Sequence, residues 1–300
     1  MLSIYISMKE VRKAVIPAAG YGTRFLPITK GVLKPMLPII DRPTIEYIVR
    51  EAMESGITDF CFVISKGGEG LVNYFKPRKD LNDFLESKGK TNELLMVNEL
   101  AEKINVSYVY QHEQLGLGHA VLCAKDFIKD EPFALLLGDD VYVGNKVPAL
   151  KQMLNAFKET NSSILGTLEV MHSEVNKYGI CKPMANQAPS RLLKLESVVE
   201  KPSLDEAPSN LAIGGRYILT PTIFSYLENQ TKGAGGEIQL TDSILRMMAS
   251  EDVYSYAIDG KRYDIGTKKG LIEATIDFAL KRDDLADFVK NIIIEKNKQF

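Results

Sequence analysis

The chain has 300 residues, of which 45% are hydrophobic, 25% charged and 8% aromatic; this is the composition of an ordinary globular protein and excludes a disordered, collagen-like or disulfide-scaffold chain. Its 37 Lys and Arg residues nearly balance 39 Asp and Glu residues, so the charge does not indicate a broad nucleic-acid surface. No apolar run approaches the roughly 18 residues that a membrane-spanning helix needs. We therefore expect a protein that binds neither nucleic acid nor a membrane.

Three cysteines, Cys61, Cys123 and Cys181, are far apart and form no CxxC pair. An odd number of widely spaced cysteines is typical of reduced thiols in a reducing compartment. The opening segment 1–7 is too short for a secretory signal and lacks its basic start. We expect a cytoplasmic protein whose fold does not need residues 1–7.

Short apolar runs alternate with segments of helical period through the first half of the chain. The runs predict buried strands, and the amphipathic segments predict helices that cover them. Predicted strands are 11–18, 60–65, 106–110 and 133–138, and predicted helices are 43–55, two within 80–103, 117–128 and 147–160. This alternation is typical of strand–helix units in a mostly parallel sheet.

Beyond residue 160 the pattern is less regular. Predicted strands are 163–170, 179–182, 191–200, 212–219 and 253–258, and predicted helices are 240–250 and two within 268–298. Polar loops between several of these strands allow antiparallel pairing, and no repeat or flexible linker divides the chain. We predict a single α/β domain over residues 1–300, with a Rossmann-like open mixed, mostly parallel sheet flanked by helices and a less regular second half.

Three familiar motifs begin in the sequence and are incomplete. A P-loop ending at 89–91 needs a glycine where Phe84 stands, and a zinc-protease signature beginning at 112 needs a histidine where Gly116 stands. Gly20 and Gly22 follow the first strand as in a dinucleotide-binding fold, but the third glycine position is Phe25. These gaps argue against a P-loop NTPase, a zinc protease and a Rossmann dehydrogenase.

A loop rich in glycine and cations follows the first predicted strand. It contains Ala18, Ala19, Gly20, Gly22, Thr23, Arg24 and Lys34. Glycines let backbone N–H groups approach a polyphosphate closely. An arginine can hold a phosphate bidentately, with a lysine as a point charge beside it. A solvated surface turn is the alternative, but the repeated glycines, cations and prolines favour a phosphate-binding loop.

Two aspartates follow predicted strands, at the edge where α/β sheets bind ligands. Asp139 follows the central strand, and Asp264 lies between a strand and a helix. Magnesium usually takes one or two carboxylates together with phosphate oxygens, so both are candidate metal ligands. Each could instead cap a turn or a helix; beside Asp139, Asp140 is the better candidate for that structural role.

Together with the loop, five further segments resemble the sugar-phosphate nucleotidyltransferases, from Met8 to near the end of the chain. The segments are 111–121, 138–140, 200–202, 207–213 and 236–242. The last is typical of the family's uridylyltransferase branch. Any one of these segments alone would be a weak signal, whereas their combination is a strong one.

The resemblance implies roles for individual residues. It implies nucleotide contacts from Ala18, Ala19, Gly20, Gly22, Thr23, Gln111 and Gly116. It implies sugar-phosphate contacts from Gly179, Glu200, Lys201 and Gly215. It implies charge stabilisation in catalysis by Arg24, Lys34 and Lys201, and a magnesium ion (Mg2+) on Asp139 and Asp264.

Several of these implied roles depend on local geometry. In the family the glutamate matching Glu200 accepts from sugar hydroxyls and the lysine matching Lys201 contacts the sugar phosphate. Neighbours on a strand point to opposite faces, so both can reach one ligand only if the chain bends there. Gln111 would present its amide to the uracil edge, and Gly116 would leave room for the base.

The resemblance implies transfer of a uridylyl group from UTP to glucose 1-phosphate, giving UDP-glucose and pyrophosphate. The sugar phosphate is already an anion near neutral pH, so the reaction needs no protein base. The family's usual Pro-Lys-Glu-Met-Leu-Pro is here Leu33-Lys34-Pro35-Met36-Leu37-Pro38, which leaves open a sister enzyme for dTDP- or ADP-glucose. A catalytically silent sugar-nucleotide-binding regulator is a further alternative, although Arg24, Lys34 and Asp139 are all present.

The predicted domain has three parts. Residues 9–145 form mainly the nucleotide-binding part, 146–282 mainly the sugar-binding part, and 283–300 a C-terminal helix. The last carries Leu285, Phe288, Val289, Ile292 and Ile293 at helical spacing. This stripe can pack on its own domain or on a partner, and because related enzymes assemble, we expect a homodimer or homotetramer with the helix at or near a contact.

Overall fold

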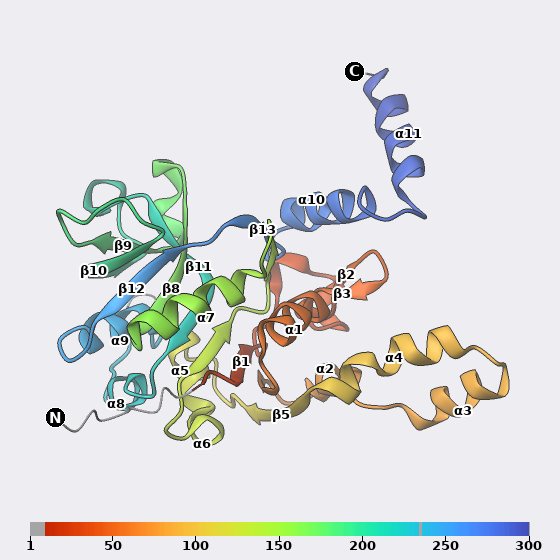
Figure 1. Ribbon diagram of the computed structural model, residues 1–300, viewed down its shortest axis with the longest axis horizontal. Helices are drawn as coiled ribbons and strands as arrows, with labels where there is room; N and C mark the ends of the chain where they lie inside the picture. Colours follow the sequence, from red (N-terminus) through yellow and green to blue (C-terminus); the bar gives the residue numbers. More distant parts are fainter. Residues whose placement is uncertain (1–9, 234–235, 300) are drawn as a thin grey trace.

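The computed structural model describes residues 10–233 and 236–299. The expectation for residues 1–7 therefore lies outside the described part of the chain. Figure 1 shows a central sheet with helices on both faces, as predicted for an α/β protein. The helices α3 (Lys79–Ser87) and α4 (Thr91–Lys103) form a hairpin that extends from the body. The C-terminal helix α11 (Ala286–Asn297) also extends from the body, at a different place (Figure 1).

The main sheet has nine strands in the order β5-β4-β1-β6-β11-β8-β12-β10-β9. Its first four members, which come from the first half of the chain, are all parallel. They are β5 (Asn105–Tyr110), β4 (Asp59–Ile64), β1 (Lys13–Pro17) and β6 (Phe133–Leu136). Their carboxyl ends meet along one edge of the sheet, as the alternation of strands and helices predicts.

Antiparallel pairs dominate the second half of the chain, apart from the parallel pair β8–β12. These strands are β11 (Leu211–Leu219), β8 (Ser163–Glu169), β12 (Val253–Ala257), β10 (Leu192–Glu200) and β9 (Gly179–Pro183). Two small ribbons complete the structure: β2 (Pro38–Ile39) with β3 (Arg42–Pro43), and β7 (Asp140–Gly144) with β13 (Gly260–Asp264). The main sheet is continuous across both halves of the chain, because β6 of the first half pairs with β11 of the second.

The remaining α-helices are α1 (Thr44–Ser55), α2 (Glu69–Tyr74), α5 (Leu117–Cys123), α6 (Lys125–Ile128), α7 (Ala149–Thr160), α8 (Ile223–Glu228), α9 (Leu240–Met247) and α10 (Lys268–Ala279). The prediction of one helix over 117–128 is wrong, because the backbone leaves helical geometry at Ala124 and divides the segment into α5 and α6. The predicted break within 80–103 is confirmed, with α3 ending before Gly89. No helix in the described part of the chain is long and apolar enough to cross a membrane.

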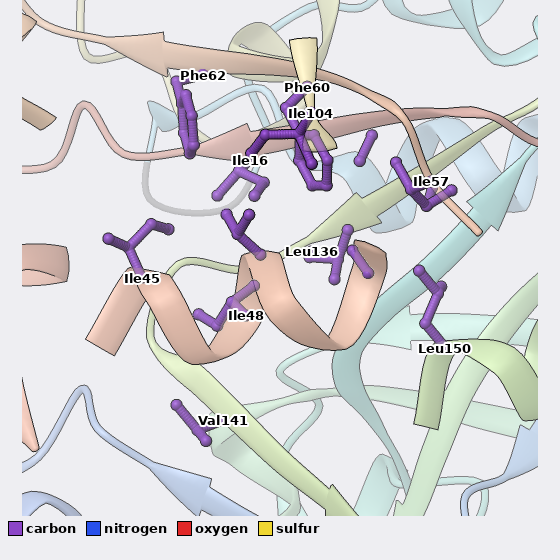
Figure 2. Close-up of a cluster of buried hydrophobic side chains, with 14 of the residues drawn as sticks. Ile16, Ile45, Ile48, Ile57, Phe60, Phe62, Ile104, Leu136, Val141 and Leu150 are labelled. Carbon is purple, nitrogen blue, oxygen red and sulfur yellow. The ribbon is translucent and has the colours of Figure 1, made fainter. Parts of the chain in front are cut away.

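Hydrophobic side chains fill both faces of the sheet. Ile16 of β1 belongs to the cluster under α1 and α7, whereas its neighbour Val15 belongs to the cluster under α5, α8 and α9. This split follows from the alternation of side chains along a strand. Figure 2 shows the first cluster, in which Ile16 and Phe62 of the sheet point toward α1, the helix that carries Ile45 and Ile48.

The cysteines are unpaired. Burial raises the pKa of the Cys61 thiol to about 11 and that of Cys181 to about 12. Both therefore remain protonated near neutral pH and pack as small apolar groups. This is consistent with the reduced thiols expected from their spacing.

A buried ion pair joins the sheet to the helices beneath it. The side chain of Arg216 on β11 is fully buried, and its Nη2 lies 2.7 Å from Glu51 Oε2 of α1. The same nitrogen donates to the backbone oxygen of Asp140, also at 2.7 Å. Glu51 Oε1 accepts a hydrogen bond from Leu150 N at the start of α7. The pair thus ties β11, α1, α7 and the start of β7 together.

Replacing Glu51 by leucine should leave the Arg216 charge buried without its partner. We expect E51L to lower the free energy of unfolding by about 3–5 kcal/mol, measured by urea denaturation. The matched control is E54L, because Glu54 is exposed on the same helix; its change should stay within about 0.5 kcal/mol. A similar small change for E51L would show that the pair is not needed for stability.

Candidate active site

Two cavities adjoin at the edge of the sheet where β1 and β6 end. The smaller has a volume of about 260 Å³ and lies against the loop that follows β1. The larger, of about 720 Å³, lies against β9, β10 and the end of β13. Leu117, Leu137 and Asp139 line both. A ligand that spans the two cavities must therefore pass Asp139.

The loop after β1 forms one wall of the smaller cavity. Its lining residues from this loop are Ala18, Ala19, Gly20, Gly22, Lys34 and Pro35. Gly22 has φ +62°, and a Cβ there would lie 3.0 Å from the Cβ of Lys34, so a larger residue would be strained and crowded. Thr29 Oγ1 closes the loop by donating to Gly22 O at 2.9 Å.

Not every residue of the predicted loop reaches this cavity. Thr23 is exposed and lines neither cavity. Arg24 is also exposed and lines the larger cavity rather than the smaller one. The reason is local: these two residues begin a 3₁₀ turn (Thr23–Phe25) that buries Phe25 and directs its neighbours outward.

The carboxylates of Asp139 and Asp264 converge. Asp139 Oδ2 and Asp264 Oδ1 each lie 2.8 Å from the point that a Cβ would occupy on Gly266. Ile265 N donates to Asp139 O at 2.8 Å, which joins the two segments. Lys34 Nζ lies 2.5 Å from Asp139 Oδ2, while Asp264 Oδ1 accepts from Gly266 N at 2.9 Å.

This donor set fits one hard cation. No group of three or more His, Cys, Asp or Glu side chains forms a metal site in residues 10–233 and 236–299, so the protein offers two carboxylates. Magnesium commonly takes one or two carboxylates and completes its shell with water and substrate phosphates. Asp139 and Asp264 can therefore hold such an ion once a phosphate is present.

The prediction that Asp140 caps a helix or a turn is wrong. Asp140 begins β7, its side chain is buried, and Arg262 Nη2 lies 2.5 Å from its Oδ1. Burial raises the pKa of Asp140 to about 7, with Arg262 acting in the opposite direction and Asp139 in the same one. The chain turns sharply after β6 and enters the β7–β13 ribbon, which directs Asp140 inward.

Gly215 is the neighbour that makes room for Asp140. It lines the larger cavity, but its φ is +75° and a Cβ there would lie only 2.1 Å from Asp140 Oδ2. Any side chain at this position would displace the carboxylate. The structure thus gives Gly215 a packing role in addition to its place beside the cavity.

Gly179, Glu200 and Lys201 come together in the larger cavity. Glu200 Oε2 accepts from Thr241 Oγ1 at 2.7 Å. Lys201 has a φ of +44°, and its N donates to Tyr178 O at 2.9 Å. A positive φ is costly for a lysine, and here it produces the bend that brings both side chains to the same cavity. The bend that the two implied contacts require is therefore present at Lys201.

Gln111 and Gly116 also line the smaller cavity. Gln111 follows β5, is only 4% exposed, and its Nε2 donates to Gly116 O at 3.1 Å. Ile238 N donates to Leu115 O at 2.6 Å. The sequence segments 111–121 and 236–242, singled out for their resemblance, therefore pack against each other.

Sequence reasoning missed several residues of the site. Tyr178 and Arg262 stack and line the larger cavity together with Thr241, and Glu237 lines the smaller one. Thr241 and Glu237 belong to the segment 236–242, so their position in the motif was the available signal. Arg262 gave no signal, because only the pairing of β7 with β13 places it beside Asp140.

Comparison with known proteins gives consistent results. The UTP–glucose-1-phosphate uridylyltransferase of Staphylococcus haemolyticus is 50% identical over 289 residues, which are 95% of this chain and 99% of that protein. A relative of the same name in Staphylococcus epidermidis is 49% identical over 291 residues, 96% of this chain and 100% of that protein.

Solved structures agree with these sequences. A UDP-glucose pyrophosphorylase complexed with UDP-glucose superimposes with a TM-score of 0.83 at 40% identity, covering 91% of this chain and 100% of that one. The UTP-bound enzyme from Acinetobacter baumannii gives a TM-score of 0.87 at 36% identity, covering 95% and 99%. The model of the nucleotidyl transferase family matches residues 13–280, and with these relatives it shows that the chain belongs to that family.

Proposed function

We propose that the protein transfers a uridylyl group from UTP to glucose 1-phosphate, giving UDP-glucose and pyrophosphate. The observation that carries this proposal is the junction of the two cavities at Asp139. One cavity offers a glycine-rich loop and Gln111 to a nucleotide, and the other offers Glu200 and Lys201 to a sugar phosphate. Relatives that share about half of the sequence are named for this reaction.

The reaction joins the two ligands at phosphorus. A phosphate oxygen of glucose 1-phosphate attacks the α-phosphorus of UTP, the new P–O bond forms, and the bond to pyrophosphate breaks. The attacking oxygen is already anionic, so no side chain needs to remove a proton. Catalysis then depends on positioning and on stabilising charge, as in other phosphoryl transfers.

The cations divide between the two ligands. Lys34 extends from the loop beside the smaller cavity, where it can stabilise charge on the departing pyrophosphate. Lys201 and Arg24 line the larger cavity, where they can hold the sugar phosphate and the phosphates that approach it. The main chain from Ala18 to Gly22 would support the triphosphate, and Thr23 at its end would help only through its backbone.

The sugar would lie against Gly179 and Glu200, beside Gly215. Glu200 is held by Thr241 and so presents a fixed carboxylate to sugar hydroxyls. Asp139 and Asp264 would hold magnesium, which when bound neutralises phosphate charge. Residues 9–145 thus supply mainly the nucleotide side, and 146–282 mainly the sugar side.

Release of pyrophosphate tests the substrate assignment. Four nucleoside triphosphates, each combined with several sugar 1-phosphates, should give the highest kcat/KM for UTP with glucose 1-phosphate. A higher value with dTTP or ATP would identify a sister enzyme, the alternative that Pro35 in the smaller cavity leaves open. Binding of UDP-glucose without any turnover would identify a silent regulator.

Replacing Asp139 by asparagine tests the metal and phosphate assignment. We expect D139N to lower kcat by about 10²–10³-fold, because the charge between the two cavities is lost while the shape is nearly kept. The matched control is D83N, an exposed aspartate on α3, which should retain full activity. A folded D139N enzyme with a normal rate at saturating magnesium would contradict the assignment.

We further propose a homodimer or homotetramer with α11 at a contact. The described residues of α11 include no buried side chain, and Phe288, Ile292, Ile293 and Ile294 are exposed on it. The alternative, that this stripe packs on its own domain, is limited to the contact of α11 with α10, which leaves Leu285 and Val289 half-buried and the other three residues of the stripe exposed. A helix with so much exposed apolar surface is typical of an interface.

Light scattering at micromolar concentration should give a mass of two or four chains. I292D should dissociate the assembly, because it places a charge in the apolar stripe. N291D adds the same charge at the neighbouring exposed position, outside the predicted stripe, and should leave the assembly intact. A monomer mass for the unmodified protein would refute the proposal.

A further inference from the structure

The side chain of Gln111 has one fixed orientation in the smaller cavity. Its amide faces the backbone oxygen of Gly116 at 3.1 Å. A backbone carbonyl can only accept a hydrogen bond, so the atom that faces it must be Nε2 with its two hydrogens. The orientation of the amide therefore follows from the chemistry of its neighbour.

His119 on α5 receives the second hydrogen of the same amide. Gln111 Nε2 lies 3.1 Å from His119 Nδ1. Because Nε2 of the glutamine can only donate, Nδ1 must accept, and the imidazole is neutral with its proton on Nε2. That nitrogen lies 3.9 Å from Cys123 Sγ, one turn along α5. With both its hydrogens used, the amide nitrogen has none left for a ligand.

The carbonyl oxygen of Gln111 remains available. Among the described residues, no group donates a hydrogen bond to Oε1, and this oxygen is not fully buried. A molecule in the cavity that Gln111 lines can therefore reach it. The site thus offers a base an acceptor and no donor from this side chain.

We propose that His119 is a positioning residue for base selection, which it achieves by holding the Gln111 amide with its oxygen toward the base. An acceptor pairs with the N3–H of uracil, whereas N3 of cytosine is itself an acceptor and would face it unpaired. Sites built around such a hydrogen bond reject the analogue that cannot form it. The inference rests on the proposed use of UTP and adds a residue that lines neither cavity.

Two variants at position 119 separate positioning from packing. H119N keeps an acceptor close to the place of Nδ1, and H119L keeps the bulk without an acceptor. The ratio of kcat/KM for UTP to that for CTP is measured with glucose 1-phosphate, or from competition of CTP against UTP where CTP turnover is too slow. We expect H119L to lower this ratio about tenfold, the effect of one lost hydrogen bond, and H119N to keep it within about twofold.

A double-mutant cycle with Q111M checks that the effect passes through the amide. In the Q111M background, which has neither oxygen nor nitrogen at this point, H119L should change the ratio no further. Should H119L fail to fold, H119A takes its place, with melting temperatures for every variant. Equal losses on UTP and CTP, or an unchanged ratio in a folded H119L enzyme, would overturn the inference.

Measurements on the unmodified protein distinguish a failure of the proposed function from a failure of the role of His119. If it shows no preference for UTP over CTP, the proposed function fails before His119 is tested. If the preference is present and H119L retains it in full, the role of His119 fails while the proposed function stands.

Discussion

The arrangement of the site depends on one buried guanidinium. Arg216 lies on β11, the strand that connects the parallel and antiparallel parts of the sheet. It binds Glu51 below the sheet and the backbone oxygen of Asp140 at its edge. A charge in the interior is stable only with well-placed partners, so these contacts restrict the turn after β6 to few conformations. Asp139 lies on that turn.

A second buried ion pair also fixes the chain around the turn after β6. Arg262 of β13 pairs with the side chain of Asp140, and Asp264 lies two residues further along the same strand. The β7–β13 ribbon therefore brings Asp139 and Asp264 to the same point from two sides of the site. The positions of Asp139 and Asp264 here depend on buried ion pairs and on strand pairing next to them, which is typical of preorganised sites. Lys34 pairs with Asp139 in this structure, and its positive charge offsets the repulsion between Asp139 and the neighbouring carboxylates.

Sequence reasoning predicts the regular parts of this molecule well and the ribbons poorly. The four parallel strands are marked by short apolar runs, and the mixed α/β class follows from the alternation of these runs with segments of helical period. The α2 and α8 helices are too short to show a helical period. The strands β7 and β13 form only by pairing with each other, although the residues they pair are 116 to 124 positions apart in the sequence. Local pattern contains no information about such a pairing.

The same limit applies to the site. Glycines, cations and acids in motifs could be predicted, and the bend at Lys201 could be inferred from the need for Glu200 and Lys201 to reach one ligand. The pair of Asp140 with Arg262 could not, because the sequence around Asp140 is equally compatible with a turn or a cap. The sequence also could not exclude the Thr23 side chain from the nucleotide site. Only the 3₁₀ turn, which buries Phe25, shows that the side chain of Thr23 points outward.

The two halves of the chain also supply different kinds of contact. In the parallel half, the loop after β1 offers backbone N–H groups and small residues, which can hold any triphosphate regardless of its base. On the proposed function, base selection would come from side chains that line the same cavity, such as Gln111, whose amide is held by Gly116 and His119. In the antiparallel half, Glu200 and Lys201 present side chains directly. On the proposed function, the triphosphate would therefore be held mainly by the backbone of the loop, whereas the base and the sugar phosphate would be held mainly by side chains.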